Sequence, residues 1–193
     1  MFVLIAGLLL FFATHAVRLY ADGWRSQVIA HQGELRWKGL YAVLAVTGLV
    51  LIVAGFAAAR AEPLVIWTPP VWTRHLAALL VLLAFVLVTA AYVPRNRLKA
   101  RLGHPMLAGV KTWAFAHLLA NGLAVHVLLF GSFFVWALLD FVAARRRDRR
   151  LGLRYPAGTV AGDVQVLVIG VVAWSLFAMV GHRWLIGVSP FGG

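Results

Sequence analysis

The sequence contains no cysteine. This absence excludes disulfide bonds, zinc sites built from thiolates, iron–sulfur clusters held by cysteine, and a cysteine nucleophile. Acidic residues are scarce as well, since six Asp and Glu stand against eighteen Lys and Arg, which gives a formal net charge of +12. Any cofactor site must therefore draw on other residue types, and seven histidines are present.

Charge of either sign is sparse overall. Only 12% of the 193 residues are charged, 63% are hydrophobic, and the mean hydropathy is +0.89. A soluble domain is roughly 45–50% apolar and about 25% charged, so this excess indicates that lipid is the solvent. The basic residues lie in short runs between apolar stretches, as in the cytoplasmic loops of membrane proteins. The expected partner is therefore membrane lipid and not nucleic acid.

The apolar runs predict an all-α, polytopic transmembrane helical bundle of about six spans, forming a single transmembrane domain over residues 1–193. A bilayer core needs about 20 apolar residues per span. The stretch 106–142 is longer than one span requires, and the turn dipeptide Asn121-Gly122 lies near its middle, so it divides in two. The expected spans are residues 2–20, 39–59, 74–93, 106–120, 123–142 and 164–186.

The distribution of basic residues gives this bundle an orientation. With six spans, fifteen of the eighteen Lys and Arg fall in or beside the first, third and fifth loops, including the run from Arg145 to Arg154. The other side holds only Arg60, Arg74 and Arg183. The positive-inside rule then predicts that these three loops lie in the cytoplasm and that both termini face the outer side of the membrane.

Two histidines are expected near the middle of the bilayer. Counted along their helices, His15 lies about 20 Å below the outer surface and His117 about 16 Å above the inner one. Two neutral imidazoles at similar depth on different helices are what a bis-histidine haem requires. An interhelical hydrogen bond from each ring is the plainer alternative. His104 and His126 are the substitutes if another pair holds the iron.

Neighbouring residues extend this candidate site. Trp113, His117 and Asn121 share one face of their helix, and Asn121 is suited either to orient the ring or to cap the helix. Arg18 lies one turn below His15, where it pairs with a haem propionate or a lipid phosphate, or extends to the interface. Lys111 is the second cation expected near the propionates.

The stretch YVPRNRLKARLGHPMLAGVKTWAFAHLLANG, residues 92–122, resembles the NnrU family of bacterial membrane proteins. The loop WTPPVWTRHLA and the segment GELRWKGL are similar to that family too, so the resemblance covers about residues 1–150. It implies a bacterial inner-membrane protein, whose two termini then lie in the periplasm, associated with nitrite and nitric oxide reduction in denitrifying bacteria.

A more distant resemblance is to the plant zeta-carotene cis–trans isomerase. The likeness consists of a histidine in the first span, a GE-containing first loop, and an HP segment followed by W-x-x-x-H. This resemblance implies haem b with histidine axial ligands, and the positions of those ligands correspond to His15 and His117 here. The haem is then expected to serve redox sensing, electron transfer or isomerase-like chemistry, and whether the chain is an enzyme stays open.

Two alternatives belong to other functional classes. One is a non-catalytic membrane factor that assists assembly of a respiratory reductase. The other is a membrane methyltransferase that uses S-adenosylmethionine, because HPMLAG is similar to that family's R-H-P-x-Y-x-G motif. Gly103 and Leu107 replace its arginine and tyrosine, and no glutamate follows Glu62, so both departures disfavour it.

The orientation is tested with topology reporters. A reporter fused after Arg150 is expected to be cytoplasmic and one fused at Gly193 periplasmic, because the charge distribution places the fifth loop inside. Paired alkaline phosphatase and green fluorescent protein fusions measure this. A cytoplasmic C-terminus would contradict the count of six spans.

Overall fold

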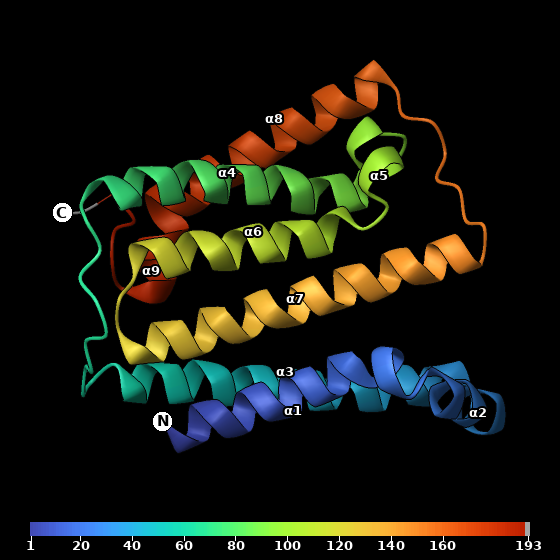
Figure 1. The fold of residues 1–193 in the computed structure, drawn as a ribbon, viewed down its shortest axis with the longest axis horizontal. Helices are drawn as coiled ribbons and strands as arrows, with labels where there is room; N and C mark the ends of the chain where they lie inside the picture. The colour runs from blue at the N-terminus through green and yellow to red at the C-terminus, as the bar shows by residue number, and fades with distance from the viewer. Residues whose placement is uncertain (192–193) are drawn as a thin grey trace. The chain divides into compact units, whose positions relative to one another are not determined.

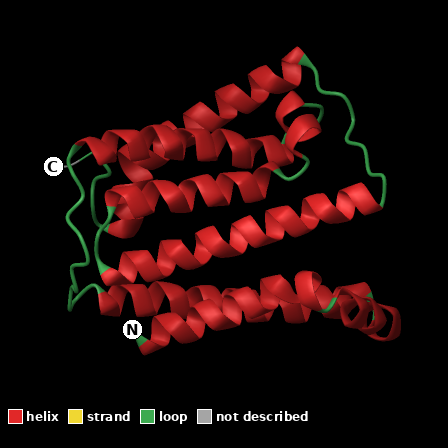
Figure 2. Cartoon of the chain, in the orientation of Figure 1, coloured by secondary structure: helices red, strands yellow, loops and turns green. Residues whose placement is uncertain are grey.

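A computed structural model describes residues 1–191, and the reporter position Gly193 lies outside them. Within this range the chain is helical, with no β-strand and a single isolated β-bridge between Val65 and Leu123 (Figure 2). The helices group into two compact units. Unit 1 comprises Met1–Ile66 and Leu123–Ser132, and unit 2 comprises Trp67–Gly122 and the chain from Phe133 on. The all-α fold class is thereby confirmed.

Unit 1 is built on two long antiparallel helices, α1 (Phe2–Tyr20) and α3 (Glu34–Ala59), with the short α2 (Asp22–Gln32) between them (Figure 1). Glycines form the contact. The backbone of α1 lies against Gly48 and Gly55, and the backbone of α3 lies against Gly7. Lipid gives apolar helices little reason to associate by burial, so small residues that allow close backbone packing hold such pairs together.

Unit 2 is organised around α4 (Trp72–Tyr92), on which both α6 (Pro105–Ala120) and α8 (Val160–Leu176) pack (Figure 1). Gly109 of α6 and Gly170 of α8 meet α4 at close range. The remaining elements are α5 (Arg97–Leu102), the part of α7 (Ala124–Arg150) from Phe133 on, the π-helix η1 (Phe177–Gly181) and α9 (His182–Ile186).

The first five expected spans each correspond to a helix, and the last, residues 164–186, corresponds to α8, η1 and α9 in succession, although several boundaries differ. Among residues 1–191, five helices are long and apolar enough to cross a membrane. The fourth expected span, residues 106–120, corresponds to α6, which has 16 residues and is about 24 Å long. α3 begins five residues before the expected position 39, because the polar turn Glu34–Lys38 is helical and carries an ion pair of 2.9 Å. α7 continues beyond 142 through the arginine run to Arg150.

The break predicted at Asn121-Gly122 separates α6 from α7. The Trp67 N–H donates to the Gly122 carbonyl at 3.2 Å, and the Ala124 N–H donates to the Leu64 carbonyl at 2.8 Å. A Cβ at Gly122 would overlap the Trp67 carbonyl, so only glycine fits there. The WTPP loop and the ANG turn, both part of the family resemblance, are therefore partners in one structure.

The glycine contact of unit 1 is testable by substitution. Gly48→Ala and Gly55→Ala are expected to lower the stability by roughly 1–3 kcal/mol, because the added Cβ meets the backbone of α1 and overpacking must push the helices apart. Thermal unfolding of the detergent-solubilised protein measures the change. Gly39→Ala is the matched control on the same helix, since its Cβ meets nothing within 4 Å. Equal effects at Gly39 and Gly55 would contradict the close contact.

Candidate functional site

His15 is held by its own helix. Its Nδ1 lies 2.7 Å from the Phe11 carbonyl, one turn earlier in α1. The Phe11 ring stacks on the imidazole with centroids 4.0 Å apart, and the Tyr41 ring of α3 approaches it edge-on at 5.3 Å. A carbonyl only accepts hydrogen bonds, so Nδ1 carries the proton and Nε2 of the neutral ring carries the lone pair.

His117 repeats this arrangement in unit 2. Its Nδ1 lies 2.9 Å from the Trp113 carbonyl, again four residues earlier, and the Trp113 ring lies 5.1 Å from the imidazole. Phe133 of α7 supports Trp113 edge-on at 5.6 Å. The two histidines thus share one local design, in which an aromatic residue four positions earlier supplies both the acceptor carbonyl and a ring against the imidazole.

The other expected site residues lie as follows. Asn121 donates from Nδ2 to the His117 carbonyl at 2.8 Å, which is the capping role that the sequence left open. The Lys111 ammonium lies over the Phe141 ring at 5.2 Å in unit 2. Arg18 is exposed in the last turn of α1. Both cations therefore lie on the cytoplasmic side of the histidine on their own helix, under the predicted orientation.

The structure of unit 1 separates His126 from His15. The His126 ring lies 5.5 Å from that of Phe56, next to Gly55, which faces Leu4 at the start of α1. His15 is eleven residues farther along α1, roughly 17 Å in axial distance. The two histidines therefore lie at different levels of unit 1.

His104, the other substitute, belongs to a polar cluster in unit 2. Asp148 Oδ2 is 2.9 Å from His104 Nε2 and accepts a hydrogen bond of 2.8 Å from the Tyr155 hydroxyl. The Asp148 side chain is only 5% exposed, and Arg145 Nη1 lies 4.0 Å from the same oxygen. Burial, reinforced by the hydrogen bond to Asp148, raises the pKa of Tyr155 to about 12. The cluster joins the start of α6, the end of α7 and the following loop.

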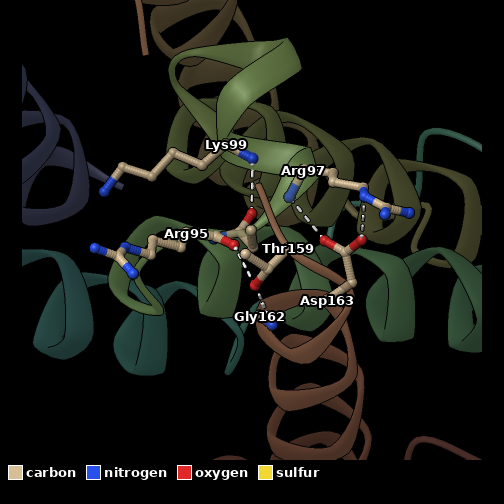
Figure 3. Close-up of polar contacts among 7 residues, drawn as sticks. Arg95, Arg97, Lys99, Thr159, Gly162 and Asp163 are labelled. Carbon is tan, nitrogen blue, oxygen red and sulfur yellow. Dashed lines mark hydrogen bonds and ion pairs between the residues drawn. The ribbon is translucent and has the colours of Figure 1, made fainter. Parts of the chain in front are cut away.

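A second polar cluster joins α4, α5 and α8 at the same end of unit 2. Asp163 accepts a hydrogen bond of 2.7 Å from the Arg97 N–H and lies 3.5 Å from its guanidinium, while Thr159 donates to the Arg95 carbonyl (Figure 3). Arg95 has a positive φ of 52°, an uncommon backbone conformation for a non-glycine residue. Asn96, 1% exposed, donates to the carbonyls of Ala90 and Val93. The PRNR segment of the recognised stretch is therefore a structural turn.

The family follows from a comparison with known proteins. The family model described as NnrU protein matches residues 3–190. The chain belongs to the NnrU family. The match confirms the resemblance and extends it past residue 150, so the C-terminal helices α8, η1 and α9 are part of the NnrU fold. No curated protein and no solved structure matches the chain.

Several contributors to these sites were missed by sequence reasoning. An aromatic residue stands four positions before each histidine, and this spacing is visible in the sequence. The sequence analysis included Trp113 in the candidate site but not Phe11. Tyr41 offers no sequence pattern that links it to His15. Asp148 and Tyr155 lie 44 and 51 residues from His104, so nothing local connects them. The single acid within the arginine run was the one available clue.

The Asp148 cluster makes a stability prediction. Asp148→Asn is expected to destabilise this NnrU-family protein by roughly 1–3 kcal/mol, because the buried hydrogen bonds of the cluster lose their charged acceptor. The pKa of Tyr155 should fall at the same time, since the carboxylate no longer opposes its ionisation. Thermal unfolding and ultraviolet titration of tyrosinate, with Tyr155→Phe as reference, measure the two effects.

Asp22→Asn is the control, because Asp22 lies at the surface in an ion pair of 3.6 Å with Arg25, and such pairs contribute little. An unchanged melting temperature and tyrosine titration in Asp148→Asn would contradict the cluster.

Proposed function

We propose that this NnrU-family membrane protein binds a b-type haem with His15 and His117 as its axial ligands. Its role is electron transfer or redox sensing in the setting of nitrite and nitric oxide reduction. One observation carries the proposal: each of these histidines has Nδ1 at hydrogen-bond distance from the carbonyl four residues earlier. The two histidines thus have the same tautomer when neutral, with the proton on Nδ1.

The donor set fits such a haem. Neutral imidazole is the usual histidine ligand of haem iron. A histidine that binds a metal usually donates its other N–H to a carboxylate, a backbone carbonyl or water, which fixes the ring and raises the basicity of the binding nitrogen. The carbonyls of Phe11 and Trp113 are suited to this function for His15 and His117. When bound, a haem with two histidine ligands supplies a one-electron couple.

The surrounding side chains suit a large, flat, apolar group with two acidic substituents. Phe11, Tyr41 and Trp113 provide aromatic surface beside the two imidazoles. Arg18 lies one turn from His15 and Lys111 six residues before His117, both toward the cytoplasmic ends of their helices. We assign these two cations as the residues that would pair with the propionates of such a haem.

The same proposal includes a location. We infer a bacterial inner membrane with both termini in the periplasm, because the predicted cytoplasmic loops hold most of the basic residues. A respiratory reductase is the class of electron partner that the family association favours.

Absorption spectra test the haem. Protein produced with adequate haem is expected to show a sharp Soret band and split α and β bands on reduction, as a low-spin haem with two histidines does. His15→Ala and His117→Ala should each abolish this low-spin spectrum, because each removes one axial ligand. Redox titration of the wild-type protein then gives the potential of the couple.

Four further histidines serve as matched controls. His31→Ala, His182→Ala, His104→Ala and His126→Ala should each retain the low-spin spectrum. A colourless wild-type protein from haem-replete cells, or ligand variants with unchanged spectra, would reject the assignment. The membrane assembly factor would then be the leading interpretation, with both histidines serving only as polar contacts within the membrane.

A further inference from the structure

The cytoplasmic end of α7 extends beyond the hydrocarbon layer. α7 has 27 residues and is about 40 Å long, against a hydrocarbon core of about 30 Å. A core that begins near Ala124, next to the outer Leu123–Val65 bridge, ends near Ala144. The helical run from Arg145 to Arg150 then crosses the layer of lipid headgroups, where the phosphates lie.

The acidic residues of this end are buried or paired. Asp148, the one acid within the arginine run, is 4% exposed and bonded to His104 and Tyr155. Asp163 is paired with Arg97. By contrast, Arg146, Arg149 and Arg150 are exposed and form no ion pair among residues 1–191. The acids therefore do not neutralise the outward-facing arginines.

Two exposed leucines stand beside these arginines in an ordered turn. Leu151 is 64% exposed and Leu153 is 55% exposed. The Leu153 N–H donates to the Asp148 carbonyl at 2.9 Å, the Gly152 N–H donates to the Arg149 carbonyl at 3.3 Å, and Gly152 has a φ of 63°. This is a Schellman cap, in which the residue at the Leu153 position commonly packs back on its helix. Here it remains exposed.

From these three observations we infer that the end of α7, Arg145–Arg150, with the turn Leu151–Leu153, is a binding surface for anionic phospholipid headgroups of the cytoplasmic leaflet. The arginines bind the phosphates, and the leucines insert into the acyl region beside them. The cluster of His104, Asp148 and Tyr155 keeps the carboxylate out of the surface and ties the loop to α6. This inference is independent of the haem.

A bilayer fits this surface better than an acidic protein does. The arginines reach the phosphate level because α7 is about 10 Å longer than the hydrocarbon core. Apolar side chains next to cations at that level are the arrangement by which peripheral segments bind anionic membranes. A cytosolic protein would require neither this depth nor leucines at the membrane boundary.

Native mass spectrometry of the full-length protein tests the inference. Delipidated protein in detergent is titrated with phosphatidylglycerol or phosphatidylcholine, and the bound lipids are counted. The wild type is expected to prefer phosphatidylglycerol by at least about tenfold, and Arg146→Gln/Arg149→Gln/Arg150→Gln should lose most of that preference. Leu151→Ser/Leu153→Ser should weaken lipid binding in both titrations. Millimolar inorganic phosphate should not displace the lipid, because it lacks acyl chains.

Arg60→Gln/Arg74→Gln/Arg183→Gln is the matched control, since it removes the same charge from the opposite side and should keep the preference. Arg146→Lys/Arg149→Lys/Arg150→Lys should also keep the preference. This variant retains the positive charge, so it separates the effect of charge from an effect of changed side chains on folding. Equal binding of the two lipids by the wild type, or an unchanged preference in the glutamine variant, would overturn the inference. Displacement by inorganic phosphate, or retention of an acidic protein in place of lipid, would overturn it too.

Discussion

Polar groups in a bilayer have no water to bond with, and this constraint organises the spans of the protein. The solution that recurs is a hydrogen bond back to the same helix. Thr14 donates to Leu10, Thr112 to Ala108 and Ser132 to Leu128, each to the carbonyl four residues earlier. His15 and His117 place Nδ1 at the corresponding carbonyls of their own helices. A hydroxyl donor is satisfied by this one bond, whereas an imidazole has a second ring nitrogen. The hydrogen bond at Nδ1 thereby defines the tautomer of each neutral ring.

The same solvent explains why glycine recurs at the helix contacts. Apolar side chains gain little by leaving lipid for another helix, so close backbone contact must provide the attraction. Gly7, Gly48 and Gly55 provide it in unit 1, and Gly109 and Gly170 provide it around α4 in unit 2. Side-chain hydrogen bonds between distant segments join one end of unit 2, in the clusters of Asp148 and Asp163. Glycine contacts thus hold the apolar lengths together, while hydrogen bonds and ion pairs hold that end.

The sequence predicts the helices well and their ends less well, for physical reasons. Hydropathy detects the part of a helix that lies in lipid, whereas the helix itself continues as long as its residues favour it. Arginine and lysine are good helix formers, so α7 extends through the arginine run to Arg150 and α3 starts at Glu34. α2 and α5 were not predicted because they are too polar or too short for an apolar pattern to reveal. At the candidate site, depth singles out His15 and His117, and a turn dipeptide places the break at Asn121. Tyr41, Asp148 and Tyr155 are absent from that prediction, since each acts through contacts with residues distant in sequence.

The HPMLAG segment shows how a motif changes meaning once its neighbours are known. As a sequence motif it is similar to that of the membrane methyltransferases. In the structure, His104 of this segment is instead hydrogen-bonded to Asp148. Gly103 has a φ of 74°, and a side chain at this position would clash with Tyr155 and Arg145. Pro105 then begins α6 without a side-chain cap, as suits the first helical position. The segment therefore fixes the end of the rigid helix that carries Trp113 and His117. In such an arrangement a residue thirteen positions from a candidate ligand influences the site through the position of the helix, without touching a cofactor.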